Sequence, residues 1–307
     1  MRIGITADVM TKHFSMEAGI ETLAALGFDA LDFPLNIYSI RNFPEGSIHR
    51  VMYTDDWRDF ACRVRDTLKA NHIAAYQVHA HWGLYTDMAA YIPPEEQFRR
   101  QIEACSIIGS RYLVFHPIPP TVRMNSVADR DAVVDYNVRW FRELVPYAEA
   151  YGVHLTLENT FSHEKHVPRD GLFPFVDAET MNQLADGIGS PNVSFCLDVG
   201  HANVELGDQL PNMVRELGKR LKVIHLHDNF GRLEPLLRSD LHMFPGYGMA
   251  DIEAVCRALG EINFEGVLSM EPSHRNMPKE RLLRVLEHII PVARYYGDIV
   301  DANRPQG

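Results

Sequence analysis

Cysteine is scarce in this sequence, and no two cysteines lie at short spacing. Cys62, Cys105, Cys196 and Cys256 are dispersed along the chain and form no Cys-x-x-Cys motif. Each lies in an apolar segment, where a buried thiol is the expected state. The sequence therefore predicts no structural disulfide.

Long hydrophobic runs are also absent. No apolar stretch approaches the roughly 18 residues that a membrane-spanning helix needs. A strand-like pattern begins at once, at residues 2–6, with no basic and apolar leader before it. We therefore expect a cytoplasmic protein without a membrane partner.

Positive charge is the third deficiency. Lys and Arg number 30 against 41 Asp and Glu, so the formal net charge is -11, and the long loops contain no basic cluster. Phosphate contacts dominate nucleic-acid binding, so this balance weighs against a nucleic-acid partner. No Gly-x-Gly-x-x-Gly motif follows a strand-like run, which leaves a dinucleotide-binding sheet without local support.

What the chain does contain is a regular alternation of short apolar runs and helical patterns. The sequence predicts strands at 2–6, 30–33, 73–78, 112–115, 154–157, 193–197 and 266–270, and one more at the short β-branched run of Val223 and Ile224 that ends in His225-Leu226-His227-Asp228. It predicts helices at 15–26, 57–70, 95–108, 129–151, 178–188, 210–217, 251–259 and 278–296, the fourth kinked at Pro146. Eight such units in 307 residues predict one α/β domain over residues 1–307, a (β/α)8 TIM barrel. Long loops follow the second and fifth strands, at 34–56 and 161–177, and we expect them to cover the active site.

Histidines and carboxylates gather where these strands end. Residues 221–248 contain His225, His227, Asp228, Asp240 and His242. Other strands lead into polar residues of the same types, namely His79, His116, Glu158, Asp198 with His201, and Glu271. In a (β/α)8 barrel the carboxyl ends of all strands open on one face, which carries the active site.

Taken singly, each of these residues has a structural explanation as a hydrogen-bonded histidine or a paired carboxylate. Taken together, so many ligand-type residues on one face indicate a metal site, because buried carboxylates are costly unless cations compensate them. Imidazole and carboxylate ligands accept several divalent metals, so manganese, magnesium, cobalt and zinc all remain open.

The ordered strand ends FCLDVGH, VIHLHDN, DLHMFPGYG and SMEP resemble the xylose isomerase-like barrel superfamily, over nearly the whole chain. Its sugar isomerases and epimerases hold one divalent ion on Glu, Asp, His and Glu from strands five to eight. The resemblance maps these ligands onto Glu158, Asp198, His225 and Glu271. It prefers His225 to His227, because the family's ligand precedes an acid by three positions, and it gives His201 a substrate-binding role.

The same superfamily contains endonuclease IV, which carries three zinc ions on a larger ligand set. This chain matches that set as well, with His79, His116, Asp240 and His242 as additional ligands and His227 as a further candidate. The number of metal ions therefore stays open. The acidic net charge, the loops without basic clusters and the sequence after Glu158-Asn159-Thr160 favour the sugar branch.

The chemistry expected of that branch is isomerisation or epimerisation of a sugar, sugar acid or cyclitol through a cis-enediolate. Glu158 and Glu271 would be the catalytic acid and base. Substrate contacts are expected from His201, His116, His79 and Trp82, and other aromatics that would cover a sugar's apolar face are Phe33, Tyr38, Phe161, Phe230 and Phe244. The alternatives are a metal-dependent lyase or hydrolase of a keto-glycoside and a multi-zinc phosphodiesterase. From the resemblance and the apolar helix 278–296 we also expect a homo-oligomer.

Overall fold

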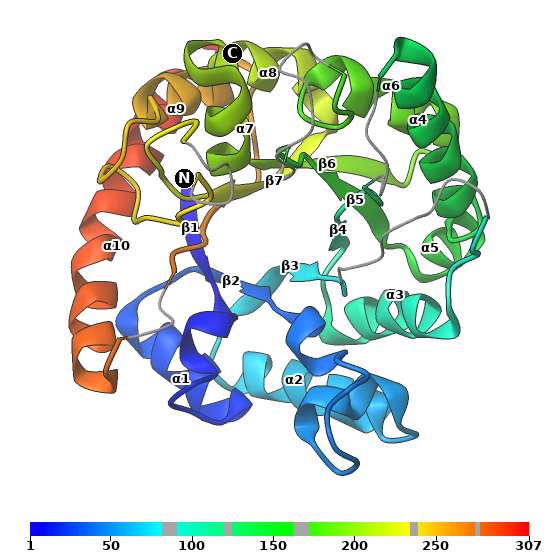
Figure 1. Ribbon diagram of the computed structural model, residues 1–307. Helices are drawn as coiled ribbons and strands as arrows, with labels where there is room; N and C mark the ends of the chain where they lie inside the picture. Colours follow the sequence, from blue (N-terminus) through cyan, green and yellow to red (C-terminus); the bar gives the residue numbers. More distant parts are fainter. Residues whose placement is uncertain (82–90, 120–124, 163–171, 234–238, 274–276, 307) are drawn as a thin grey trace.

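The computed structural model describes residues 1–81, 91–119, 125–162, 172–233, 239–273 and 277–306. Within them, eight parallel strands pair in sequence order and close on themselves, β8 against β1 (Figure 1). The strands are β1 (Arg2–Thr6), β2 (Ala30–Phe33), β3 (Ala74–His79), β4 (Tyr112–Phe115), β5 (His154–Glu158), β6 (Val193–Asp198), β7 (Leu221–Leu226) and β8 (Val267–Met270). The predicted (β/α)8 barrel is confirmed.

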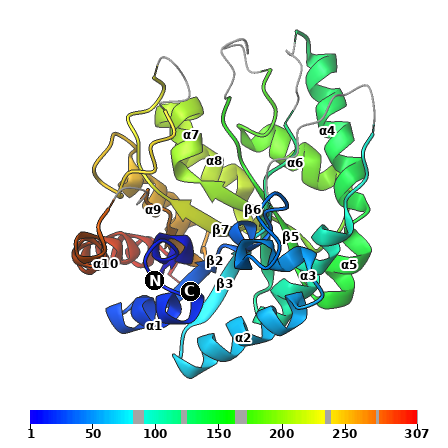
Figure 2. The ribbon, with the colours of Figure 1, turned by 60° about the horizontal axis from the view of Figure 1, so that its bottom comes forward.

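Helices form a ring outside the strands (Figures 1 and 2). They are α1 (Met16–Leu26), α2 (Trp57–Ala70), α3 (Glu96–Ile108), α4 (Val127–Arg142), α5 (Val145–Tyr151), α6 (Ala178–Ile188), α7 (Val199–Leu206), α8 (Leu210–Leu217), α9 (Ile252–Glu261) and α10 (Lys279–Ala302). Short 3-10 turns occupy Ala7–Met10, Leu35–Tyr38, Ile48–Tyr53, Gly207–Gln209 and Gly218–Arg220. Among the described residues, no helix combines the length and hydrophobicity needed to cross a bilayer.

Strand alternation divides each strand between two environments. In β4, Leu113 and Phe115 belong to the large core that includes the helices, whereas Val114 joins Cys196 and Val223 in a separate small cluster. Successive strand side chains point to opposite faces, so Val114, Cys196 and Val223 fill the inside of the barrel. The inward positions at the carboxyl ends of β5, β6 and β7 are Glu158, Asp198 and His225, which places these polar residues together at one mouth.

The structure corrects two expectations about helices. The predicted helix at 129–151 is two helices, because the chain breaks between α4 and α5 rather than kinking. Pro146 lies in the first turn of α5, where its missing N–H costs no helical hydrogen bond. In addition, α7 begins directly after Asp198, in a segment for which no helix was predicted.

Two aromatic residues also lie elsewhere than expected. Phe33 and Tyr38 do not face the mouth. Their rings stack at 5.7 Å between centroids, and both pack against Phe60 of α2 in the main core. Phe33 follows the inward Asp32, so alternation turns it outward. The loop 34–56 is thus anchored to the barrel exterior by its first residues, while its role as a cover remains a prediction.

Candidate metal centre

Four ligand-type side chains converge at the carboxyl end of the barrel. Glu158 ends β5, Asp198 ends β6, His225 lies in β7 and Glu271 follows β8. Each offers one oxygen or nitrogen, and all four atoms lie within 4.8 Å of one another. The His225 Nδ1 atom is 3.1 Å from Glu158 Oε1 and 3.2 Å from Glu271 Oε2. We refer to these four residues as the central cluster.

Glu158 is also the meeting point of two histidines from neighbouring strands. Its Oε2 atom lies 3.4 Å from His79 Nε2 and 3.0 Å from His116 Nε2. His79, Glu158 and His225 form a further group of possible ligands. The imidazoles of His79 and His225 stack with centroids 5.7 Å apart, so β3, β4 and β7 all present nitrogen donors to one buried carboxylate.

The end of β6 is fixed by hydrogen bonds in two directions. Asp198 is the N-cap of α7, and its Oδ1 accepts the backbone N–H of His201 at 2.7 Å. The Asn159 side chain accepts the backbone N–H of Asp198 at 2.7 Å and donates to the carbonyl of Asp198 at 3.0 Å. The carboxylate therefore sits at the positive end of a helix and is locked to the neighbouring strand β5.

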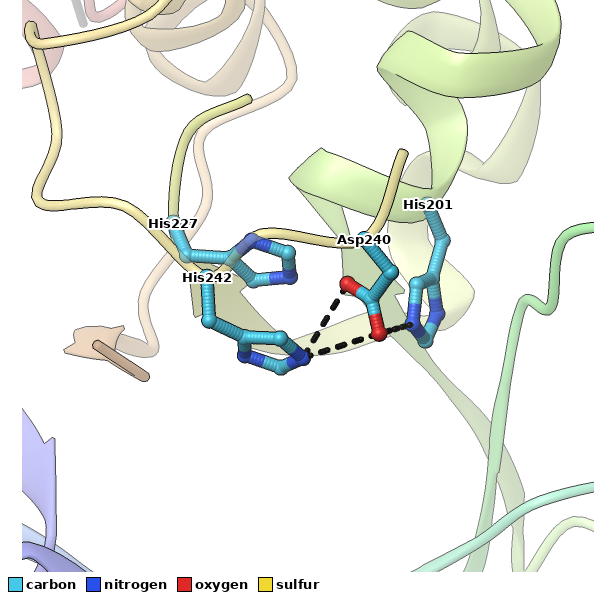
Figure 3. Close-up of side chains that lie close together, drawn as sticks. All are labelled: His201, His227, Asp240 and His242. Carbon is cyan, nitrogen blue, oxygen red and sulfur yellow. Dashed lines mark hydrogen bonds and ion pairs between the residues drawn. The ribbon is translucent and has the colours of Figure 1, made fainter. Parts of the chain in front are cut away.

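A second cluster lies beside the central one and consists of His201, His227, Asp240 and His242 (Figure 3). His242 Nε2 is 3.1 Å from Asp240 Oδ1, and His201 Nε2 is 3.9 Å from Asp240 Oδ2. The rings of His227 and His242 stack at 3.9 Å between centroids. His227 Nε2 lies 2.9 Å from the Asp198 carboxylate, which therefore joins the two clusters.

The loop after β7 brings Asp240 and His242 to this position, and Asp228 holds it there. The Asp228 carboxylate accepts four backbone N–H groups at 2.8 to 3.1 Å, from Asn229, Gly246, Gly248 and Ala250. Asp228 also forms an antiparallel bridge with Met243. His242 has a positive φ of 45°, and its Nδ1 donates to the carbonyl of Glu271 at 2.9 Å. Main-chain contacts thus fix the second cluster.

Within the two clusters, imidazoles and carboxylates shift the pKa values of one another. Burial raises the pKa of Glu158, but the positive charges of His225 and His116 outweigh it and hold that pKa well below its usual value. Burial lowers the pKa of His79, whereas its interaction with Glu158 raises it, with a net result of about 9. Burial also lowers the pKa of His242, but the hydrogen bond to Asp240 and the charge of Glu271 raise it more, to about 10. The raised pKa values of His79 and His242 thus favour positive charge beside these carboxylates when no metal ion is bound.

These residues fit a divalent metal ion. Imidazole nitrogens and carboxylate oxygens are the donors that zinc and manganese accept. A bound cation would supply the positive charge that the imidazolium groups supply without it. In the second cluster, the buried Nδ1 atom of His227 makes no hydrogen bond within the described structure and packs against Gly200 of α7.

The structure brings together the expected ligands that it describes, except Asp228, whose carboxylate binds backbone N–H groups of the loop instead. His79 and His116 lie against Glu158, while His201 lies in the second cluster rather than in the central one. Phe161 does reach the site, with its ring 4.9 Å from that of His201. Trp82 lies outside the described residues, as do residues 163–171 of the loop expected to cover the mouth.

Two carboxylates that were not predicted from the sequence lie on the other side of the site. Asp32 of β2 lies 3.2 Å from His225 Nε2, and Asp8 follows β1. Burial raises the pKa of Asp8 to about 7, and the charges of Glu271 and Asp32 add to this shift. Both residues are at carboxyl ends of strands, so the rule that identified the other ligands could have found them.

The sequence profile of the xylose isomerase-like TIM barrel family matches residues 20–291. The chain belongs to this family. The match covers every strand except β1, and therefore all members of both clusters.

Three curated relatives resemble the chain. An uncharacterised protein of Methanocaldococcus jannaschii is 30% identical over 57% of this chain and 55% of its own length, so the chain spans about half of that relative. An inosose isomerase of Bacillus licheniformis is 25% identical over 66% of this chain and 69% of its own length. A D-psicose 3-epimerase of Enterocloster bolteae is 27% identical over 89% of this chain and 82% of its own length.

Solved structures share the fold. A D-tagatose 3-epimerase-like protein superposes with a TM-score of 0.70 at 22% identity, over 98% of this chain and 99% of the other. A structure described as IolI protein with a bound zinc atom superposes with a TM-score of 0.65 at 16% identity, over the full length of both chains. At these identities the likeness concerns the barrel itself.

Gly200 provides a direct test of the packing around the second cluster. A Cβ atom at this position would lie 1.9 Å from His227 Cε1, so Gly200→Ala must displace the imidazole. Overpacking of this kind typically costs about 1–3 kcal/mol of unfolding free energy. We expect a loss in that range by chemical denaturation, and we expect the double variant Gly200→Ala/His227→Ala to recover most of it.

Gly297→Ala in α10 is the matched control. There the new Cβ would lie 3.2 Å from Met1 Cβ, a contact that a small shift relieves, so the loss should be smaller. Equal stability of Gly200→Ala and the wild type would contradict the observed packing of His227 on α7.

Proposed function

We propose that this protein is a divalent-metal-dependent isomerase or epimerase acting on a sugar, sugar acid or cyclitol. The observation that carries the proposal is the convergence of Glu158 and Glu271 on the same nitrogen of His225, at 3.1 and 3.2 Å. Two carboxylates from strands on different sides of the mouth thus approach one point. Paired carboxylates in this arrangement suit proton removal and return at one carbon atom.

The names of the relatives support the reaction class. Inosose isomerase and D-psicose 3-epimerase both denote rearrangements of small polyhydroxylated molecules. The zinc of the IolI structure supports a metal-dependent reaction in this family. The substrate proposed here is accordingly a small sugar or sugar derivative, with no membrane and no nucleic acid involved.

Glu158, Asp198, His225 and Glu271 would hold the ion. When bound, the ion would polarise the carbonyl of a hydroxy-ketone and lower the pKa of the adjacent C–H. Its identity among manganese, magnesium, cobalt and zinc does not follow from the donor set, because mixed nitrogen and oxygen ligands suit several of them.

The chain's own groups carry the proton. One of Glu158 and Glu271 removes the proton next to the carbonyl, and the other, as the carboxylic acid, donates its own proton to the opposite face of the resulting cis-enediolate, which inverts the carbon. The barrel separates the two residues, because β6 and β7 lie between β5 and β8. Glu158 is 2% exposed in its side chain and Glu271 is 25% exposed, so Glu271 has the easier access to a substrate.

Histidines around the carboxylates would bind the substrate hydroxyls. The His116 side chain is 31% exposed and can reach a substrate in the mouth, whereas that of His79 is 7% exposed and would form the floor. His201 would contact a substrate hydroxyl through Nε2, since its Nδ1 donates to the carbonyl of Asn159 at 3.0 Å. Trp82 remains a proposed contact for the apolar face of the sugar.

Proton NMR in deuterium oxide tests this route. During incubation of a panel of ketoses and inososes, the wild type should introduce deuterium at the carbon next to the carbonyl of its substrate, because the abstracted proton exchanges with solvent. Glu158→Gln and Glu271→Gln keep the side-chain shape and one oxygen ligand but lose the base. Turnover in each should fall by a factor of about 100 or more while substrate binding survives.

Single Gln variants also separate the two half-reactions. A variant that keeps one base can still exchange the substrate proton on that base's face without completing epimerisation. Wild-type turnover that leaves no solvent deuterium in the product would contradict the two-base route and would leave both glutamates as ligands alone.

The second cluster favours one alternative function, a multi-metal phosphodiesterase that resembles endonuclease IV. His201, His227, Asp240 and His242 can hold an ion next to the central cluster, and His79 can share another with Glu158 and His225. The net charge of -11 argues against a nucleic-acid substrate, since the backbone of DNA is itself polyanionic.

Metal content distinguishes these two functions. Protein refolded or reconstituted with excess metal and then dialysed should contain one ion per chain if it is the isomerase, and Asp198→Ala should lose that ion. Two or three ions per chain, together with hydrolysis of a phosphodiester, would favour the alternative. Full retention of metal by Asp198→Ala would contradict the assignment of the central cluster.

Self-association is proposed as well, on a surface other than the one first expected. Most apolar residues of α10 are buried or half-buried against the barrel, and only Pro291, Tyr295 and Ala302 of them are exposed, so that helix offers no continuous apolar face. Exposed apolar side chains instead occur on the segment after β7, where Phe230, Tyr247 and Met249 are 48%, 61% and 75% exposed. We expect light scattering at micromolar concentration to report a homo-oligomer, and a monomer would contradict this.

A further inference from the structure

The histidines of the site are held in two different ways. In three of them Nδ1 donates to a main-chain carbonyl and Nε2 faces the site, namely His79 on Ala80, His201 on Asn159 and His242 on Glu271. His225 is reversed. Its Nδ1 faces Glu158 and Glu271, and its Nε2 faces Asp32 Oδ2 at 3.2 Å.

Because the His225 ring is reversed, Asp32 contacts the nitrogen that does not face the central cluster. A metal ligand nitrogen must be free of its proton, so an imidazole that binds through Nδ1 carries its proton on Nε2. That N–H then lies at ion-pair distance from a carboxylate instead of on a neutral carbonyl, although the structure shows no hydrogen bond between the two. A carboxylate in this position fixes the tautomer and the ring plane and makes the imidazole a stronger donor.

Burial strengthens the electrostatic interaction between Asp32 and His225. The Asp32 side chain is 2% exposed and that of His225 is fully buried, so solvent does not screen the pair. Among the described residues, His225 is the basic side chain at ion-pair distance from Asp32, and Oδ1 of Asp32 makes no hydrogen bond there. Glu271 adds negative charge nearby, and its charge and that of Asp32 both raise the pKa of Asp8. A buried carboxylate so poorly compensated by the fold does little for stability.

We infer that Asp32 is a positioning residue that orients and polarises His225 for metal binding. This inference rests on the proposed function, since it concerns the same ion. Asp32 comes from β2, on the far side of His225 from the central cluster, and does not itself belong to that cluster. Neighbours of this kind change metal affinity by about 10- to 100-fold when they are removed.

The test compares Asp32→Ala, Asp32→Asn and the wild type as metal-free proteins titrated with zinc or manganese against a chromophoric chelator. Asp32→Ala should raise the dissociation constant of the ion by about 10- to 100-fold. Asp32→Asn keeps an oxygen that accepts the Nε2–H but loses the charge, so its loss should be smaller. The thermal midpoint of both metal-free variants should equal or exceed that of the wild type, which a merely structural role would not allow.

Asp29→Asn is the matched control. Asp29 lies three residues earlier, at the amino end of the same strand, where it pairs with Arg294. Its replacement should leave metal affinity unchanged. The visible spectrum of the cobalt-substituted protein provides a second readout and should shift in Asp32→Ala but not in Asp29→Asn.

The outcomes separate this inference from the proposed function. A wild type that binds no divalent ion would overturn both. A wild type that binds an ion, with Asp32→Ala and Asp32→Asn binding it equally well, would overturn the role of Asp32 and leave the proposed reaction standing.

Discussion

A buried carboxylate surrounded by imidazoles is the interaction on which the mouth of this barrel depends. The two oxygens of Glu158 lie within 4 Å of nitrogens of His79, His116, His201 and His225. Removing one charge of such a buried set is costly, because the remaining charges lose their compensation. The strands that end at this mouth are therefore coupled through Glu158, whether protons or a metal ion supply the positive charge.

Separate parts of the molecule support the barrel and the site. Outward side chains such as Phe115 and Leu197 pack against helices in the main core. The polar mouth is held by capping and main-chain hydrogen bonds, in which Asp198 starts α7 and Asp228 holds the loop after β7. Because this support is mostly backbone, the loop between β7 and α9 presents Asp240 and His242 as fixed groups, which preorganises them for a ligand.

Most of the barrel and most of the site residues could be predicted from the sequence, because the pattern of strands and helices is regular. Parallel buried strands read as short apolar runs between amphipathic helices, and the limits of β2, β4 and α8 agree with those predicted. Because a barrel gathers all strand ends on one face, the ligand set followed from topology without knowledge of any distance. The sequence could not say which ligands share a cluster, since that depends on the path of the loop after β7.

The failures have physical causes as well. Asp32 is flanked by Leu31 and Phe33, and the apolar neighbours hid an inward carboxylate that strict alternation would have revealed. Phe33 was placed at the mouth for the same reason, although alternation turns it toward α2. The helix α7 was missed because Asp198 is at once the last residue of a strand, a candidate ligand and a helix cap.

The most direct measurement of the central claim is anomalous diffraction from crystals of the protein grown with manganese. The account predicts a strong peak within bonding distance of Glu158, Asp198, His225 and Glu271, at the carboxyl end of the barrel. Manganese bound elsewhere on the protein, with no peak among these four side chains, would contradict it.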